Sequence, residues 1–135
     1  MSELGKKIWL VDDDPVYQSL TIHLFEMEGS NSQLEVYSNG LEAIQCLESR
    51  LKSGEELPKV ILLDLFMPVM DGWGFLEEFD NQITQSLKDQ NIIIYVISST
   101  IDPDDISRAK SNKCVRDFFI KPIRREELFK VANCA

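Results

Sequence analysis

The stretch Val60-Ile-Leu-Leu-Asp64-Leu-Phe-Met-Pro68-Val-Met-Asp71-Gly72 decides the fold that we predict for this chain. It starts with an apolar run without polar alternation, which is typical of a parallel strand buried on both faces. Asp64 ends the run, and Pro68 and Asp71-Gly72 then stop the strand and predict a structural turn. Apolar residues at helical spacing follow over 73–79. We therefore expect Asp64 at the carboxyl edge of a sheet, where open α/β folds bind ligands.

Working outward, the sequence predicts four further short strands, each followed by a turn or a polar residue; three contain apolar runs, and the one over 33–37 alternates polar and apolar residues as a half-buried edge strand does. They cover residues 7–11, 33–37, 92–97 and 115–120. Amphipathic patterns predict a first helix that starts at Pro15, with Asp14 as its N-cap, and ends at Gly29. Four further helices are predicted over residues 41–51, 73–79, 103–109 and 126–132. A polar segment over 81–91 is expected to be a helix tail and a connection. This strand and helix order predicts a parallel sheet with right-handed crossovers and helices on both faces.

The composition fits a single domain over residues 1–135, and we expect no output domain. The formal net charge of −9 argues against direct nucleic-acid binding. No apolar segment approaches the ~20 residues of a membrane span and no signal peptide is evident, so we expect a cytoplasmic protein. Cys46, Cys114 and Cys134 are widely spaced, and we expect buried free thiols rather than a disulfide framework or a zinc site.

Acidic residues end two of the predicted strands. Asp12 and Asp13 follow the first strand and Asp64 ends the third, and these strands should be neighbours at the switch point of the sheet. Clustered carboxylates raise one another's pKa unless a cation offsets the repulsion. Carboxylate and carbonyl oxygens without histidine or cysteine suit Mg²⁺, so the sequence predicts a magnesium site at this edge.

The other strands that reach this edge end in groups of different chemistry. Ser98-Ser99-Thr100 follows the fourth strand and supplies hydroxyls, while Lys121 follows the fifth strand and supplies a fixed positive charge. Together with the acids, these groups indicate phosphoryl transfer to a carboxylate, with Asp64 as the nucleophile.

These motifs, taken in order, resemble the receiver domain of two-component response regulators. The matching pieces are Val11-Asp12-Asp13-Asp14-Pro15, Asp64-x-x-Met67-Pro68-x-Met70-Asp71-Gly72, the hydroxyls after Ile97, and Lys121-Pro122. The resemblance extends from Lys7 to about Val131. It implies a flavodoxin-like, doubly wound (βα)5 fold with strand order 2-1-3-4-5.

The resemblance also implies a role for each acid. Asp64 would accept a phosphoryl group from a histidine kinase or a histidine phosphotransfer protein. Asp13 and Asp64 would bind Mg²⁺ directly, helped by the backbone carbonyl of Phe66, and Asp12 would act through water. Lys121 would contact the phosphoryl group.

Three further positions carry expectations from the resemblance. Ser98 directly follows the apolar strand, as the family's threonine or serine does, whereas an ungapped count back from Lys121 gives Ser99; we expect Ser98 to contact the phosphoryl group. Phe118 matches the family's switching aromatic, and without a hydroxyl it can switch only by packing. The Lys121-Pro122 bond is expected to be cis.

The resemblance implies a signalling switch rather than an enzyme, with self-catalysed phosphorylation and dephosphorylation as its only activity. An aspartyl-phosphate phosphatase would need a second acid at the position of Phe66. The alternative is a pseudo-receiver that docks partners without being phosphorylated. We expect output through an unknown downstream protein, no contact with a membrane, and a monomer or a phosphorylation-dependent dimer.

Overall fold

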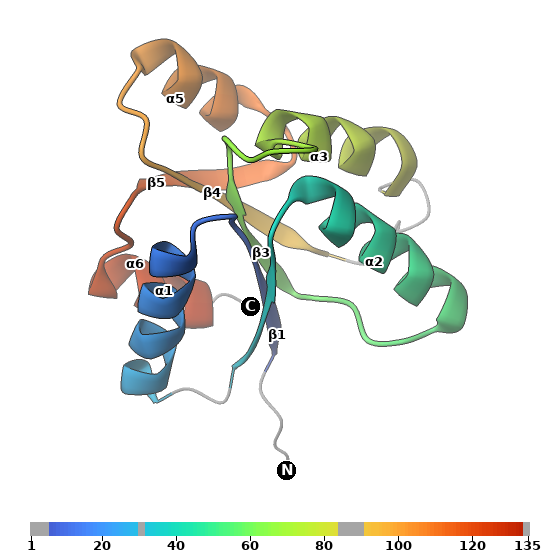
Figure 1. The fold of residues 1–135 in the computed structure, drawn as a ribbon, viewed down its shortest axis with the longest axis horizontal. Helices are drawn as coiled ribbons and strands as arrows, with labels where there is room; N and C mark the ends of the chain where they lie inside the picture. The colour runs from blue at the N-terminus through green and yellow to red at the C-terminus, as the bar shows by residue number, and fades with distance from the viewer. Residues whose placement is uncertain (1–5, 30–31, 84–90, 134–135) are drawn as a thin grey trace.

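Five parallel strands form one sheet in the order β2-β1-β3-β4-β5 in the computed structural model, which describes residues 6–29, 32–83 and 91–133 (Figure 1). The strands are β1 (Lys7–Val11), β2 (Gln33–Tyr37), β3 (Val60–Asp64), β4 (Ile93–Ser98) and β5 (Val115–Ile120). Every residue of the central strand β3 is buried. The predicted flavodoxin-like, doubly wound fold and its strand order are confirmed.

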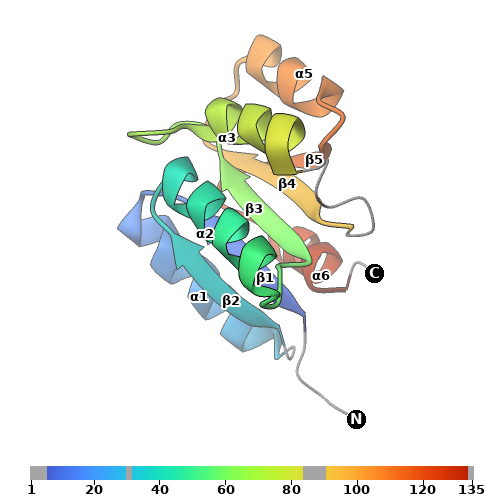
Figure 2. The same cartoon turned by 90° about the vertical axis from the view of Figure 1, so that its right-hand side faces the viewer.

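Helices cover both faces of the sheet (Figures 1 and 2). The helices α1 (Pro15–Glu28) and α6 (Arg125–Asn133) lie on one face, and α2 (Gly40–Ser53), α3 (Gly72–Glu78) and α5 (Pro103–Ser111) lie on the other. One π-helical turn, η1 (Phe79–Ile83), continues α3. Among the described residues, none of the helices combines the length and the apolar character of a membrane-spanning segment.

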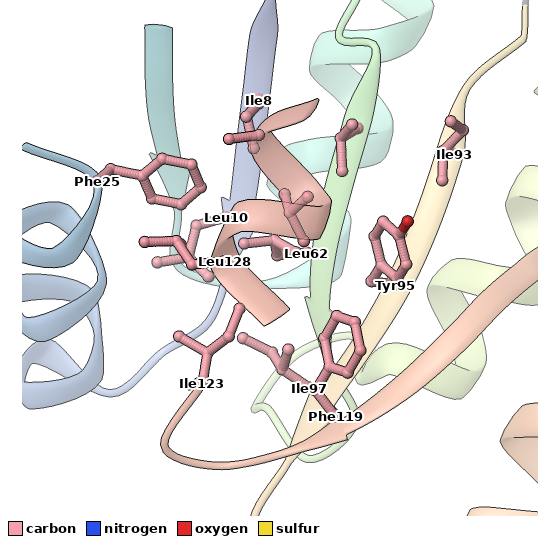
Figure 3. Packing of buried hydrophobic residues seen from close by; sticks show 13 residues of the cluster. Ile8, Leu10, Phe25, Leu62, Ile93, Tyr95, Ile97, Phe119, Ile123 and Leu128 are labelled. Carbon is pink, nitrogen blue, oxygen red and sulfur yellow. The ribbon is translucent and has the colours of Figure 1, made fainter. Parts of the chain in front are cut away.

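The strands contribute alternate side chains to the apolar core on each face, because neighbouring strand residues point to opposite sides. On one face, Phe25 of α1 and Leu128 of α6 pack against Leu62 of β3 and its neighbours (Figure 3). On the other face, Leu63 of β3 packs with Phe75 of α3. The unbroken apolar run in β3 is therefore required by burial on both sides.

Most predicted element bounds agree with the structure, and the deviations have local causes. β4 runs one residue later at both ends than predicted, because its pairing with β3 starts at Ile93 and its pairing with β5 extends to Ser98. At the start of α1, Asp14 accepts a hydrogen bond from the backbone N–H of Val16 as predicted, and Gly29 ends the helix with φ at 77°.

The expectation that the cysteines are buried is wrong for the two that the structure describes. Cys46 and Cys114 are free thiols, as expected, but both are only half-buried. Cys46 lies beside a polar group, with its sulfur 3.3 Å from the hydroxyl of Tyr37. Cys134 and most of the connection predicted over 81–91 lie outside the described residues.

The loop after β3 turns back tightly on the end of that strand. The N–H of Gly72 donates to the carbonyl of Leu65 at 2.8 Å, and a Cβ atom at Gly72 would lie 2.4 Å from the carbonyl oxygen of Asp64. Asp71 caps α3 by accepting a hydrogen bond from the N–H of Gly74 at 2.9 Å. The predicted turn therefore fixes the backbone on which Asp64 is presented.

Substitution of Gly72 by alanine should destabilise the protein, because the new methyl group would overlap the backbone of Asp64. We expect a loss of about 1–3 kcal/mol, typical of overpacking, in a urea titration. Gly74→Ala is the matched control, since its Cβ would meet the flexible Met70 side chain at 3.1 Å, and it should stay within about 1 kcal/mol of the wild type. Equal stability of the two variants would show that the loop does not press position 72 against the end of β3.

Candidate functional site

Four neighbouring strands present polar groups at the carboxyl edge of the sheet. Asp12 directly follows β1, Asp64 ends β3, Ser98 ends β4, and Lys121 directly follows β5. Since β1, β3, β4 and β5 are parallel and adjacent in this order, their carboxyl ends meet at one edge. The strand order thus brings together residues separated by more than a hundred positions in the sequence.

Three carboxylates converge at this edge. Asp12, Asp13 and Asp64 each offer an oxygen, and these oxygens lie within 4.8 Å of one another. Asp12 is 0% exposed and Asp64 is 5% exposed, whereas Asp13 is exposed to solvent. The predicted convergence is confirmed, and it places two buried acids next to one exposed acid.

The backbone around Asp12 is held by contacts from three sides. Its N–H donates to the carbonyl of Tyr37 in β2 at 2.9 Å, and its Oδ1 accepts from the N–H of Asp14 at 3.0 Å. The side-chain amide of Gln18, in the first turn of α1, donates to the carbonyl of Asp12 at 2.6 Å. These contacts leave Oδ2 as the oxygen of Asp12 that faces the other charged groups.

Lys121 places a positive charge between the two buried acids. Its Nζ lies 2.7 Å from Oδ2 of Asp12 and 3.2 Å from Oδ2 of Asp64, and its side chain is only 6% exposed. Its backbone N–H donates to the carbonyl of Ser98 at 2.9 Å, which joins the ends of β4 and β5. The Lys121–Pro122 peptide bond is cis, the isomer that the family resemblance implies.

The electrostatics of the pocket follow from burial and from these pairings. Burial raises the pKa of Asp64 to about 6; the ammonium of Lys121 opposes this shift, and the charge of Asp12 adds to it. Burial disfavours the charged form of Lys121, but the hydrogen bond to Asp12 and the charges of Asp64 and Asp12 outweigh it, so the pKa of Lys121 is raised. Asp64 is therefore mostly ionised at neutral pH.

The donor set of the pocket fits a hard divalent cation such as Mg²⁺. The three clustered side chains are all carboxylates, and hard cations prefer oxygen ligands. Oδ2 of Asp12 is buried and, apart from its ion pair with Lys121, has no hydrogen-bond donor among the described residues. A buried carboxylate oxygen with spare acceptor capacity is what an additional cation would satisfy.

The two candidate hydroxyls differ in burial. Ser98 is 0% exposed, and its Oγ accepts a hydrogen bond from the N–H of Thr100 at 3.3 Å, whereas Ser99 is exposed. Register places Ser98 beside Ile120 on β5, directly before Lys121. Its position at the strand end favours Ser98 over Ser99 as the hydroxyl of the site.

Phe66, predicted to offer its backbone carbonyl to the metal, and Phe118, the predicted switch aromatic, lie in different surroundings. Phe66 lies on the loop after β3 with its side chain half exposed. Phe118 is buried in a small apolar cluster with Leu65, Val96 and Ala109, the last of which belongs to α5. Phe118 therefore contacts the sheet, the residue that follows Asp64, and the helix α5.

Sequence reasoning missed two α1 residues that contact the site. Gln18 holds the carbonyl of Asp12, and the ring of Tyr17 lies over the ammonium of Lys121, with 4.4 Å between the ring centroid and Nζ. The available signal was their place in the first turn of the helix that directly follows the acids. Helical periodicity places both residues in an amphipathic helix but does not predict their contacts with the site.

Comparison with known proteins gives one consistent family. Residues 8–133 match the family described as response regulator receiver domain. The probable methanogenesis regulatory protein FilR2 of Methanothrix harundinacea is 33% identical over 121 residues, covering 90% of this chain and 75% of that protein. The probable C4-dicarboxylate response regulator DctR of Bacillus subtilis is 26% identical over 90% of this chain, which spans only 48% of DctR.

Solved structures agree with the fold. A two component response regulator from Cytophaga hutchinsonii superposes with a TM-score of 0.83 at 23% identity, covering 97% of this chain and 96% of that one. The Mn²⁺-bound form of response regulator Rcp1 has a TM-score of 0.73 at 26% identity, covering 95% of this chain and 89% of that one. The arrangement of strands and helices in this chain is thus shared with response regulators.

The raised pKa of Asp64 predicts a pH-dependent stability difference between the wild type and Asp64→Asn in the absence of metal. Because the folded-state pKa of about 6 exceeds the ordinary 3.8, the folded protein holds the proton more tightly, and stability is lost as the pH rises from about 4 to about 6. The variant lacks this titration, so its stability relative to the wild type should rise by about 2–3 kcal/mol over that interval.

Urea titrations in EDTA at several pH values measure this difference. Asp13→Asn is the control, since Asp13 is exposed and its removal should change the profile much less. A wild-type minus Asp64→Asn difference that stays constant with pH would show that the carboxyl group of Asp64 is not held in a desolvated pocket.

Proposed function

The chain belongs to the response regulator receiver domain family, and on that premise we propose that it is a switch controlled by phosphorylation of Asp64. The observation that carries the proposal is the position of this buried carboxylate, with the ammonium of Lys121 at 3.2 Å and two further acids beside it. A carboxylate nucleophile needs a nearby positive charge to receive a phosphoryl group, and Lys121 supplies it.

In the proposed reaction, an oxygen of Asp64 forms a bond to phosphorus while the bond from phosphorus to the donor's histidine nitrogen breaks. The histidine leaves with the electron pair and takes a proton from solvent. Lys121 pairs with the transferred phosphoryl oxygens, and the buried Ser98 supplies a hydroxyl donor at the neighbouring strand end. These residues position the acceptor and neutralise charge, which is the main contribution of a protein to phosphoryl transfer.

We propose Mg²⁺ as the resident cation. Asp13 and Asp64 would hold it directly with the backbone carbonyl of Phe66, and Asp12 would act through water. The ion would neutralise charge on the phosphoryl oxygens. The all-carboxylate cluster supports this assignment, as does the likeness to Rcp1, whose solved form is bound to Mn²⁺.

The proposed phosphodonor is a histidine kinase or a histidine phosphotransfer protein, and the proposed receiver of the signal is a downstream protein. The chain would act as a signalling switch, with self-catalysed phosphorylation and dephosphorylation as its only chemistry. A pseudo-receiver that only docks partners is less well supported, because it would not need the buried acids and Lys121 that this site retains.

The apolar cluster around Phe118 could transmit a conformational change from the site to the surface. Phosphorylation adds about −1.5 to −2 charge and strong acceptor oxygens. If Ser98 moves towards them, Phe118 can fill the space that Ser98 leaves, which alters its contacts with Val96 and Ala109 and hence the packing of α5 on the sheet. This is a shift between two packings, driven by the better interaction of one of them with the phosphoryl group.

Incubation with acetyl phosphate and Mg²⁺ should add one phosphate to the wild type, measured by intact mass. Asp64→Asn should give no adduct, because the nucleophile is removed. Asp71→Asn is the matched control: it removes a carboxylate only seven positions away but keeps the helix cap, since asparagine also caps helices. The proposal is wrong if the wild type stays unmodified or if Asp64→Asn is still phosphorylated.

Ser98→Ala should uncouple Phe118 from the site, whereas Ser99→Ala should not, because only Ser98 is buried at the strand end. We expect beryllofluoride, a mimic of the phosphoryl group, to shift the NMR signals of Phe118 and change its relaxation dispersion in the wild type and in Ser99→Ala. The response should be largely lost in Ser98→Ala. An unchanged Phe118 in the wild type, or loss of the response in Ser99→Ala alone, would refute the assignment.

A further inference from the structure

Lys121 has an aromatic partner in addition to its two carboxylates. The ring centroid of Tyr17 lies 4.4 Å from Nζ of Lys121, within the distance at which an ammonium is attracted to an aromatic face. Tyr17 itself is half-buried, whereas the side chain of Lys121 is 6% exposed. The partly exposed ring of Tyr17 thus covers the buried ammonium on the side of α1.

The start of α1 holds Tyr17 in this place. Asp14 caps the helix and Pro15 occupies its first turn, which fixes where the helix begins. The next residue, Gln18, ties the same turn to the loop of acids through its 2.6 Å hydrogen bond to the carbonyl of Asp12. The position of the ring relative to the acids is therefore determined by the backbone as well as by side-chain packing.

The aromatic face suits this place for a physical reason. An ammonium has three N–H donors, and two carboxylates lie close to that of Lys121. A third carboxylate would hold the ammonium back from an incoming anion, and water would screen its charge. An aromatic face attracts the cation but offers no strong acceptor, so it excludes water without competing for the N–H groups that a new anion needs.

We propose that Tyr17 is a positioning residue that holds the ammonium of Lys121 at the acid pocket and shields it from water. Its effect on phosphoryl transfer rests on the function proposed above, whereas its effect on Lys121 does not. Tyr17 touches neither the phosphoryl group nor Asp64 in this scheme; it acts through Lys121. The ring, and not the hydroxyl, is the functional part.

The first test observes Lys121 directly, without a phosphodonor. In protein with isotopically labelled lysine, the Cε methylene signals of Lys121 should be displaced by the ring current of Tyr17. Tyr17→Phe keeps the ring, so the displacement should be preserved and the ammonium protons should exchange with water as slowly as in the wild type. Tyr17→Leu keeps apolar volume without the ring and should lose the displacement and speed the exchange.

The second test measures phosphorylation by acetyl phosphate with Mg²⁺ over a range of donor concentrations. Tyr17→Leu should lower the maximal rate by about three- to thirty-fold, the range expected for loss of a cation–π contact. Tyr17→Phe should stay within about two-fold of the wild type. Val16→Ala, an exposed change in the same helical turn, is the control and should leave both readouts unchanged.

The outcomes separate this proposal from the proposed function. A wild type that takes no phosphate contradicts the function, but the lysine signals still decide the role of Tyr17. The proposal on Tyr17 is overturned if the wild type shows no ring-current displacement, if Tyr17→Leu phosphorylates at the wild-type rate, or if Tyr17→Phe fails like Tyr17→Leu. Thermal unfolding of each variant confirms that the compared proteins are folded.

Discussion

The placement of the Lys121 ammonium between Asp12 and Asp64 is the interaction on which the site depends. Two buried carboxylates repel each other and lose their hydration, and this arrangement is tolerated only when a cation compensates. The strand order supplies that cation, because it places the end of β5 next to β4 and close to the acids of β1 and β3. The strand order of the doubly wound sheet is thus what allows the charges of the two buried acids to be balanced.

Burial and the Lys121 ammonium affect the two buried acids differently. Burial raises the pKa of Asp64 to about 6, and Lys121, which lies closer to Asp12 than to Asp64, offsets this shift only in part. Under the proposed function, a divalent cation and a phosphoryl group would redistribute these pairings. The tight turn at Gly72 and the hydrogen bonds around Asp12 fix the backbone, so such a redistribution would involve mainly side chains.

Much of this could be predicted from the sequence, and the parts that could not depend on three-dimensional contacts. The apolar run before Asp64 identified the central strand, and residue types at successive strand ends identified the acids and Lys121. Periodicity could not show that Ser98 belongs to β4 and is buried while Ser99 is exposed, because that follows from the register with β5. Nor could it find the contacts of Tyr17 with Lys121 and of Gln18 with Asp12, which depend on where α1 lies relative to the acids. It also could not show the partial exposure of Cys46 and Cys114.

The most direct measurement is a crystal structure of the chain with Mg²⁺ and beryllofluoride. We expect the metal to be bound by Asp13 and Asp64, beryllium to be attached to a carboxylate oxygen of Asp64, and Lys121 to contact a fluoride. The central claim is that the clustered acids and Lys121 form one pocket for a cation and a phosphoryl group. It would be contradicted if the metal bound elsewhere, or if Lys121 kept only its present carboxylate partners while beryllofluoride failed to occupy the site.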